Sequence, residues 1–269
     1  MSSAGATGIL SHFSRDNAVR IQRLLDALSS TKEKQDTIAL NLKDASPSKL
    51  AAVFVLLFEE DKHLRVLLTT RGKTLKFHGG ETALPGGMRD ETDGDLIHTA
   101  RREALEEVSL PFWSPHVHTL GTLDPHMFYN LTVIPVIALL TDNTLLLDLR
   151  PRPQEVEHIF THSLEAFLDP NLAQTHQSNL VDQGSGYWPF ESKYHYFRDY
   201  DVKRLGGTLY RYHQFRSSAS PVTGLTADIL LETAGICFGR EPQFERWAPT
   251  QLRTYEEVAK GHDQFQITG

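Results

Sequence analysis

Apolar residues along the chain follow two spacings, and the first of these marks strands. The segment LAAVFVLLF, residues 50–58, is apolar almost without interruption, and a polar turn separates it from HLRVLLTTR, residues 63–71. The segment NLTVIPVIALL, residues 130–140, has the same character. A strand that is buried on both faces reads in this way. The pattern therefore predicts two strands joined by a turn, and a third interior strand of a sheet.

The second spacing, with apolar residues three and four positions apart, predicts helices over residues 17–28, 95–108 and 225–239. Gly239 is expected near the C-terminal cap of the last helix. Residues 155–170 predict a short strand followed by a helical turn, and residues 208–215 predict another strand. Strands and helices thus alternate along the chain, which indicates a mixed α/β fold.

Changes in this pattern divide the chain into three parts. Residues 1–46 are expected to form an N-terminal extension that carries one helix. Residues 47–240 form the main domain, interrupted at about residues 171–193 by a polar, Gly- and Ser-bearing insertion that predicts a loop. Residues 241–269 are polar and predict a C-terminal tail that packs only partly.

Composition narrows the class of protein. The formal net charge of −7 and a pI of about 6.0 disfavour a protein that coats nucleic acid, because such binding needs clustered positive charge. The single cysteine, Cys237, excludes an internal disulfide, and its apolar surroundings predict a buried structural thiol. Residues 50–58 are too few to span a bilayer. We expect an intracellular protein that does not contact a membrane. Zinc is disfavoured because no HExxH pattern accompanies the lone cysteine.

The segment RREALEEVSL, residues 101–110, crowds three glutamates onto one predicted helix. At about 100° per residue, Glu106 lies about 60° to one side of Glu103 and Glu107 about 40° to the other, so the three carboxylates share one arc. Taken alone, such a cluster is more often a solvated acidic face. Hard divalent cations, however, prefer carboxylate oxygens, and Arg102 is placed to hold one carboxylate by a forked hydrogen bond.

The residues before the helix favour the metal interpretation. The segment LPGG ends in Gly86 and Gly87, which allow close approach to a metal or a phosphate. The stretch from Gly87 onward resembles the Nudix box, and Arg102, Glu103, Glu106 and Glu107 supply its most specific half. The sequence departs from that pattern in three ways. The interval to Arg102 is one residue longer than in the commonest version, Asp93 stands for the upstream glutamate, and Ser109 stands for the final glycine.

The segment LLTTRGKTLKFHGGETALPGG, residues 67–87, resembles the signature of the coenzyme A diphosphatase subfamily. Gly72 stands for the subfamily's serine, Lys76 for its arginine and Leu84 for its phenylalanine. EVEHIF, residues 155–160, and GLTADIL, residues 224–230, are also similar to that subfamily. The resemblance covers roughly residues 49–239 and points to a eukaryotic member of the peroxisomal type.

This resemblance implies a Nudix α/β/α sandwich with a central mixed β-sheet and hydrolysis of coenzyme A and acyl derivatives to 3',5'-ADP and 4'-phosphopantetheine. It implies Mg²⁺ or Mn²⁺ as cofactor, held by Glu103, Glu106 and Glu107. The expected catalytic residues are Glu107, Glu106, Arg102 and Glu155, with Glu157 as an alternative to Glu155. The expected substrate-binding residues are Arg71, Lys76, Gly80, Gly86 and Gly87; Lys73 and His78 lie in the same basic run.

Three other functions stay open at this point. Hydrolysis of oxidised nucleoside triphosphates of the 8-oxo-dGTP type uses the same fold, and so does hydrolysis of nucleotide caps on RNA. A non-enzymatic Nudix-like binding module would be expected to lack Glu103 or Glu107, and both are present. The resemblance favours a peroxisomal location, although QITG at the end is unlike a Ser-Lys-Leu signal; the cytoplasm is the alternative. A homodimer is a further open expectation.

Overall fold

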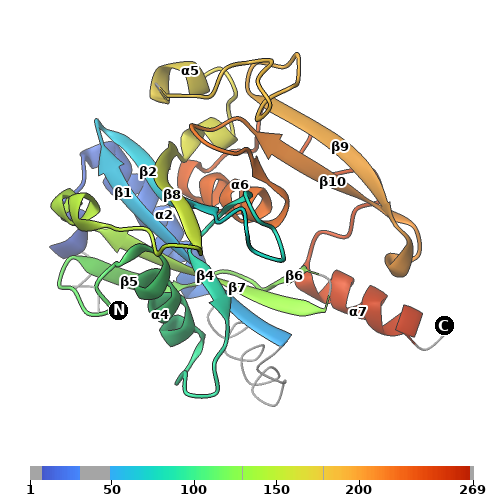
Figure 1. Ribbon diagram of the computed structural model, residues 1–269, viewed down its shortest axis with the longest axis horizontal. Coiled ribbons are helices and arrows are strands. Elements are labelled where there is room, and N and C mark those ends of the chain that lie inside the picture. The colour runs from blue at the N-terminus through green and yellow to red at the C-terminus, as the bar shows by residue number, and fades with distance from the viewer. Residues whose placement is uncertain (1–7, 31–48, 129, 178, 267–269) are drawn as a thin grey trace.

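The structure is a computed structural model that describes residues 8–30, 49–128, 130–177 and 179–266. Its centre is a hairpin of β1 (Leu50–Glu60) and β2 (His63–Arg71), beside which β7 (Leu131–Leu140) runs parallel to β1 (Figure 1). Parallel and antiparallel pairs thus occur in one sheet, which confirms the expected mixed sheet. The strands predicted over residues 50–58, 63–71 and 130–140 are confirmed.

Shorter strands extend this sheet in the order β3-β2-β1-β7-β5, with β4 beside β1, β6 beside β7 and β8 beside β2. They are β3 (Thr82–Ala83), β4 (Gly86–Met88), β5 (Val117–Thr122), β6 (His126–Phe128) and β8 (Val156–Ser163). Only β8 was expected from the sequence; the turn η3 (Glu165–Phe167) follows it as predicted.

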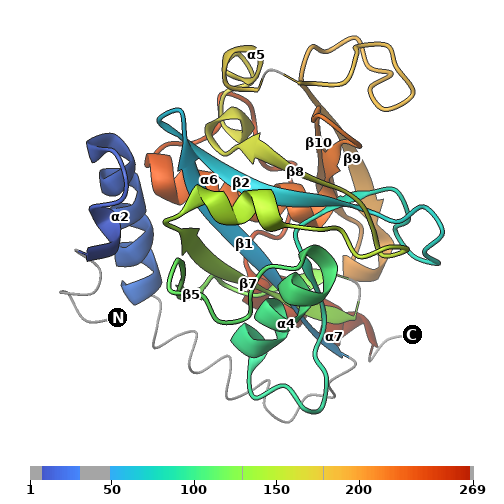
Figure 2. The ribbon, with the colours of Figure 1, turned by 60° about the vertical axis from the view of Figure 1, so that its left-hand side comes forward.

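Helices cover both faces of the sheet, which confirms the α/β/α arrangement (Figure 2). On one face, α4 (Leu96–Val108) packs its small residues Ala100 and Ala104 against Phe54 and Leu56 of β1. On the other face, α2 (Arg15–Ser30) and α6 (Gly224–Phe238) share a core with the alternate residues of β1. The three predicted helices are therefore confirmed, and Gly239 ends α6 in a left-handed conformation.

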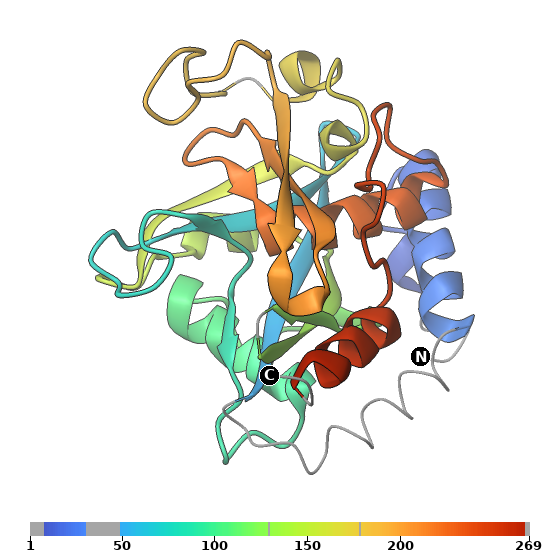
Figure 3. The same cartoon turned by 90° about the vertical axis from the view of Figure 1, so that its right-hand side faces the viewer.

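A second, antiparallel sheet is built from β9 (His195–Val202), β10 (Thr208–Phe215) and β11 (Val222–Thr223) (Figure 3). The strand β10 was predicted, whereas β9 was not. Short elements precede or join these strands: η2 (Asn143–Asp148), α5 (Ala173–His176) and η4 (Lys203–Leu205). The hydroxyl of Thr82 donates to the carbonyl of Ser220 at 2.6 Å, which connects the first sheet to the segment before β11.

The terminal parts of the chain pack against the domain. Ile21 and Leu24 of α2 are fully buried in the same core as α6. A helix absent from the sequence prediction, α7 (Tyr255–Gln266), lies against η4 and β6. The division into an N-terminal extension, a main domain and a C-terminal tail stays a prediction. Its first boundary, between residues 46 and 47, lies outside the described residues. No helix within the described ranges is both long and apolar enough to cross a membrane.

The pairing of the strands determines where the predicted site residues meet. Gly86 and Gly87 of β4 lie opposite Val53 and Ala52 of β1, next to the sheet face that α4 covers. Arg71 ends β2 opposite Val156, the first residue of β8, so the segment that precedes β8 ends beside Arg71. The glycine pair, the glutamate helix, Arg71 and the segment with Glu155 are therefore neighbours, although Arg71 and Glu155 are 84 positions apart in the chain.

Candidate metal and active site

The glutamate helix α4 begins at a capping residue and is then fixed by a buried ion pair. The carboxylate of Asp95 accepts a hydrogen bond from the backbone of His98 at 2.7 Å, the usual device for ending a helix at its N-terminus. Arg102 donates to Asp93 through two of its guanidinium nitrogens, Nε to Oδ1 at 3.0 Å and Nη2 to Oδ2 at 3.0 Å. This forked geometry fixes the loop before α4 to the helix.

Asp93, the residue that departs from the expected upstream glutamate, is the anchor of this loop. Its side chain also accepts hydrogen bonds from the backbone of Asp90 at 2.9 Å and the hydroxyl of Thr99 at 2.8 Å. Burial alone would raise the pKa of Asp93, but these bonds and Arg102 outweigh it and hold the pKa well below its usual range. Asp93 is therefore a permanent carboxylate in a structural role.

Arg102 extends this anchor to the glutamates. The third guanidinium nitrogen, Nη1, donates to Oε1 of Glu103 at 2.8 Å, and Nη2 also donates to the carbonyl of Met88 at 3.0 Å. Asp93 and Glu103 together raise the pKa of Arg102, so it stays charged. The predicted forked hydrogen bond exists, but its fork holds Asp93, and Arg102 positions Glu103 through its third nitrogen.

The glycine pair makes room for the glutamates. The backbone N–H of Gly86 donates to Oε2 of Glu107 at 3.2 Å. A Cβ on Gly87 would lie 2.5 Å from the carboxyl carbon of Glu103, and a Cβ on Gly86 would collide with the carbonyl of Ala52. Neither position therefore accepts a side chain without displacing either a glutamate or the backbone of β1.

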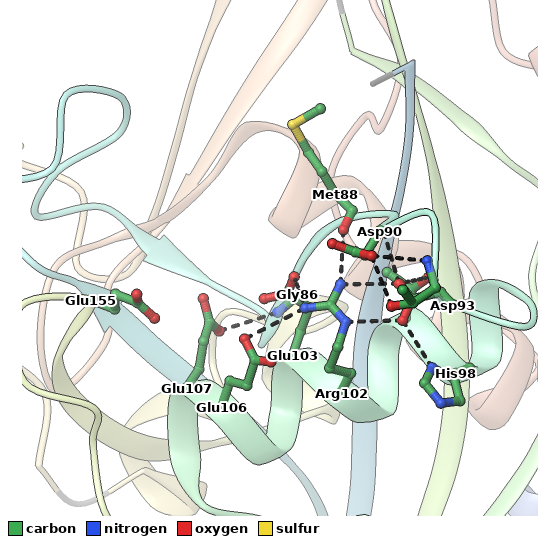
Figure 4. Close-up of polar contacts among 12 residues, drawn as sticks. Gly86, Met88, Asp90, Asp93, His98, Arg102, Glu103, Glu106, Glu107 and Glu155 are labelled. Atoms are coloured by element: carbon green, nitrogen blue, oxygen red, sulfur yellow. Dashed lines mark hydrogen bonds and ion pairs between the residues drawn. The ribbon is translucent and has the colours of Figure 1, made fainter. Parts of the chain in front are cut away.

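The three glutamates line one side of α4 and differ in exposure (Figure 4). Glu107 is buried, and this burial raises the pKa of its carboxyl to about 7, with Glu103 and Glu155 adding to the effect. Burial likewise raises the pKa of Glu103, opposed by Arg102. Glu106 is the most exposed, with 41% of its side-chain surface accessible. A buried carboxylate beside a half-buried one forms a site that a cation would stabilise.

The fit of a divalent cation follows from the donor set. Glu103, Glu106 and Glu107 offer only carboxylate oxygens, the ligands that Mg²⁺ and Mn²⁺ prefer. As the described residues stand, no three histidine, cysteine or carboxylate side chains converge on one point. Glu103 is held by Arg102, and Glu107 by Gly86, so small rotations of these side chains must accompany binding. The residue types fit the ion, and Gly87 lets the carboxylate of Glu103 lie directly against β4.

Glu155 faces the glutamates from the segment that precedes β8 (Figure 4). Its neighbour Arg152 fastens that segment to α4, since the backbone N–H of Arg152 donates to the carbonyl of Glu107 at 2.9 Å. Glu157, the alternative to Glu155, points elsewhere and pairs with Lys73 at 2.7 Å. This hydrogen bond lowers the pKa of Glu157, which makes it a poorer proton acceptor.

The expected substrate-binding residues divide into two groups. Arg71 reaches the site, with Nη1 3.9 Å from Oε1 of Glu107. Lys76 lies over the ring of Phe77, 5.3 Å from its centroid, and contacts none of the glutamates in the described part of the chain. Gly80 has a φ of +80° and donates its N–H to the carbonyl of Arg71 at 2.9 Å, which closes the loop. Lys76 and Gly80 thus belong to the loop 72–81 rather than to the glutamate cluster.

The sequence did not indicate a functional role for two residues of the site, Asp93 and Arg152. The pairing of Asp93 with Arg102 crosses from a loop to a helix, so no helical periodicity reveals it. Arg152 lies 45 residues beyond Glu107 in the chain, and only the β2–β8 pairing brings its segment to the site. For Asp93, the available signal was its position, because the Nudix pattern has an acidic residue there, usually glutamate.

Comparison with known proteins agrees with this geometry. The NUDIX domain family matches residues 48–183, just over half of the chain. The chain belongs to the Nudix family. A mitochondrial Nudix hydrolase of Arabidopsis thaliana is 37% identical over 221 residues, covering 80% of this chain and 68% of that protein. A mouse peroxisomal coenzyme A diphosphatase is 33% identical over 163 residues, covering 60% of this chain and 65% of the relative.

The chain therefore spans about two thirds of the length of each of these Nudix relatives. Among solved structures, the NUDIX domain of NrtR from Shewanella oneidensis, crystallised with ADP ribose, is 23% identical. That match covers 47% of this chain and 82% of the other, with a TM-score of 0.34. Nudix hydrolases generally need a divalent metal such as Mg²⁺ or Mn²⁺.

Two departures have local physical reasons, one from the Nudix pattern at Ser109 and one from the subfamily signature at Gly72. Ser109, in place of glycine, ends α4 with a φ of +61°, a left-handed conformation that glycine adopts with less strain. Its hydroxyl compensates in part by donating to the carbonyl of Arg150 at 3.2 Å. Gly72, in place of serine, lies so close to the carbonyl of Gln154 that a Cβ would collide with it. In this Nudix chain, the loop before β8 therefore requires glycine at position 72.

Proposed function

We propose that the chain hydrolyses the pyrophosphate bond of coenzyme A and its acyl derivatives to 3',5'-ADP and 4'-phosphopantetheine or its acyl form. The observation that carries this proposal is the segment over residues 67–87, which resembles the coenzyme A diphosphatase signature and leads directly into the glutamate site. The mouse relative named for that activity supports it.

The chemistry of the substrate agrees with the placement of the basic residues. Coenzyme A carries a pyrophosphate between its pantetheine and its 3'-phosphorylated adenosine, so it needs cations at two separate places. Arg71 lies beside Glu107, where a pyrophosphate held at the glutamates would be. Lys76 lies on the loop 72–81, and we assign to it the 3'-phosphate.

The reaction combines a cation with the carboxylates of this chain. Mg²⁺ or Mn²⁺ on Glu103, Glu106 and Glu107 would neutralise charge on the pyrophosphate and lower the pKa of a bound water. Gly86 and Arg102 hold Glu107 and Glu103 in place for this task. We assign proton removal from the attacking water to Glu155, because it faces the cluster from outside α4. Glu106 is the alternative acceptor.

A comparison of substrates tests the proposal. Coenzyme A, 8-oxo-dGTP, ADP-ribose and an RNA with a nucleotide cap would be offered with Mg²⁺, with Mn²⁺ and with a chelator, and kcat/KM compared. We expect coenzyme A to be cleaved best, and only with metal. Faster cleavage of 8-oxo-dGTP or capped RNA would replace the substrate but keep the site, whereas no metal-dependent cleavage of any of them would remove the hydrolase assignment.

Lys76→Ala provides a sharper test of the loop. Loss of the ammonium group should raise the KM for coenzyme A and leave the KM for dephospho-coenzyme A unchanged, because the second substrate lacks the 3'-phosphate. Equal effects on both substrates would contradict the assignment of Lys76.

The proposal also includes the cellular location and the oligomeric state of the protein. The relatives carry the names of three organelles, mitochondrion, chloroplast and peroxisome. We propose the peroxisome, the organelle of the coenzyme A diphosphatase, and fluorescence microscopy of the tagged chain would test this. A homodimer, tested by light scattering, also stays a proposal.

A further inference from the structure

Arg152 lies at the rim of the glutamate site and is not among the residues assigned to metal binding or proton removal. Its Nη1 is 3.3 Å from Oε2 of Glu155 and 3.6 Å from Oε2 of Glu106. Its side chain is about half exposed, at 48%. The guanidinium thus stands between two carboxylates that come from different segments, with one side open to solvent.

Its bonding differs from that of Arg102. Arg102 donates to Asp93, Glu103 and the carbonyl of Met88, so its donors are already in use. Arg71 and Arg152, by contrast, make only ion pairs of 3.3 to 3.9 Å with carboxylates, and among the described residues neither guanidinium makes a side-chain hydrogen bond. The Nε of Arg71 is buried and has no hydrogen-bond partner in the part of the chain that the structure describes. Such long ion pairs contribute little to stability and exchange readily for another anion.

The two arginines are carried by segments that are fastened together. The N–H of Gly72 donates to the carbonyl of Glu155 at 2.8 Å, immediately after Arg71. The backbone of Arg152 is held to Glu107 of α4. Gly72 also packs directly against the carbonyl of Gln154, where a Cβ would collide. Arg71 and Arg152 therefore reach the Glu106–Glu107 end of α4 from two segments that are hydrogen-bonded to each other.

We propose that Arg152, together with Arg71, binds the two phosphate groups of the substrate's diphosphate. This inference rests on the proposed diphosphate hydrolysis and adds a substrate-binding residue to it. A guanidinium offers two parallel N–H donors to a phosphate, and a pair of them matches the two phosphates of a diphosphate. A divalent cation on Glu106 would take over the charge that Arg152 now offsets, which frees Arg152 to turn toward the phosphate.

Binding of a diphosphate that cannot be cleaved tests the inference without relying on coenzyme A. Methylenediphosphonate would be titrated by calorimetry into the wild type, Arg152→Gln and Arg152→Lys, each saturated with Mg²⁺. The matched control is Arg150→Gln, because the Arg150 guanidinium is close in the chain but donates only to the carbonyls of Leu147 and Leu149. Mn²⁺ binding without diphosphonate would be measured by electron paramagnetic resonance in each variant.

We expect Arg152→Gln to weaken diphosphonate binding about tenfold or more, the usual effect of losing a charge-assisted hydrogen bond. Arg152→Lys should be intermediate, Arg150→Gln should match the wild type, and Mn²⁺ binding should not weaken in any of the three. Wild-type diphosphonate affinity in Arg152→Gln would overturn the inference. A parallel loss of Mn²⁺ affinity would also overturn it, because Arg152 would then only position Glu106. If the wild type binds diphosphonate in this way but does not cleave coenzyme A, the proposed substrate fails and the role of Arg152 stands.

Discussion

The backbone N–H of Gly86 and the Oε2 atom of Glu107 lie 3.2 Å apart, which joins the glycine pair of β4 to the most buried glutamate of α4. One residue further on, the Cα of Gly87 faces the carboxylate of Glu103 with no room for a side chain. The glycines of this site therefore act on the glutamates directly, by a hydrogen bond at one position and by close approach at the next.

Gly87→Ala should reduce turnover by about tenfold or more while the protein stays folded. The new Cβ would lie 2.5 Å from the carboxyl group of Glu103 and push that flexible side chain out of the cluster. Gly94→Ala is the matched control, because nothing lies within 4 Å of a Cβ at that position. The measurement is kcat together with the circular dichroism spectrum of each variant, and equal activity of the two variants would contradict the role of Gly87.

Glu107→Gln should lower turnover by about two orders of magnitude or more, because an amide binds a hard divalent cation less well than a carboxylate does. Steady-state kinetics with saturating Mg²⁺ measures this effect. Leu105→Gln is a suitable control on the same helix, since Leu105 is exposed at 42% and points away from the buried face. A fully active Glu107→Gln protein would remove Glu107 from the metal site.

Glu107→Gln should gain stability relative to the wild type as the pH rises, when metal is absent. Burial raises the pKa of Glu107 from 4.5 to about 7, so its contribution to stability is full below pH 4.5 and is lost as the pH rises through about 7. A glutamine does not titrate. Urea unfolding with a chelator should show Glu107→Gln gaining on the order of 2 kcal/mol on the wild type between pH 5 and pH 8. A difference that does not change with pH would show that burial does not perturb Glu107.

His162 should make the protein less stable in mild acid. It is fully buried between the carbonyls of Ser163 and Arg216, and burial lowers its pKa from 6.5 to about 4. A lowered pKa means that the stability is full above pH 6.5 and is lost as the pH falls toward 4, because only the unfolded chain takes up the proton in that window.

The measurement for His162 is the free energy of unfolding of the wild type and His162→Gln between pH 7 and pH 4.5. The wild type should lose on the order of 2 kcal/mol more than the variant over this range. His195 and His213 also have pKa values lowered by burial, to about 3 and about 4, so the variant should retain part of the slope. Parallel curves would show that His162 does not contribute.

Ser109→Gly should raise the stability by up to about 1 kcal/mol, because Ser109 holds a left-handed conformation at the end of α4. The lost hydrogen bond from its hydroxyl to Arg150 reduces the gain. Ser109→Ala keeps the strain and loses the hydrogen bond, so it should be less stable than the wild type. Thermal unfolding of the three proteins gives the order, and an alanine variant at least as stable as the glycine variant would exclude strain at this position.

Segments that are apolar on both sides or at helical spacing were predicted correctly, because burial alone defines them: β1, β2, β7 and α4 are examples. The strand β9 was missed because its residues are mostly exposed or half-buried, so no apolar pattern marks it. Likewise α7 has a polar sequence beyond Glu241 and is placed by contacts with η4 and β6, which the sequence does not show.

The site residues that the sequence predicts are likewise those that lie close together in the chain. Helical geometry within one segment predicts Glu103, Glu106 and Glu107, and nearness in sequence to that helix predicts Gly86 and Gly87. The anchoring of Arg102 by Asp93 depends on how a loop folds back, and the approach of Arg152 depends on the pairing of β2 with β8. Long-range pairing of this kind leaves no periodic trace in the sequence.

We propose that the glutamate cluster and the loop before it form a metal-dependent hydrolase of coenzyme A. Chromatography and mass spectrometry of the products formed from coenzyme A with Mg²⁺ test this proposal. We expect 3',5'-ADP and 4'-phosphopantetheine in equal amounts, and none in the presence of a chelator. Intact coenzyme A after prolonged incubation with Mg²⁺ or Mn²⁺, or product formation that a chelator does not prevent, would contradict it.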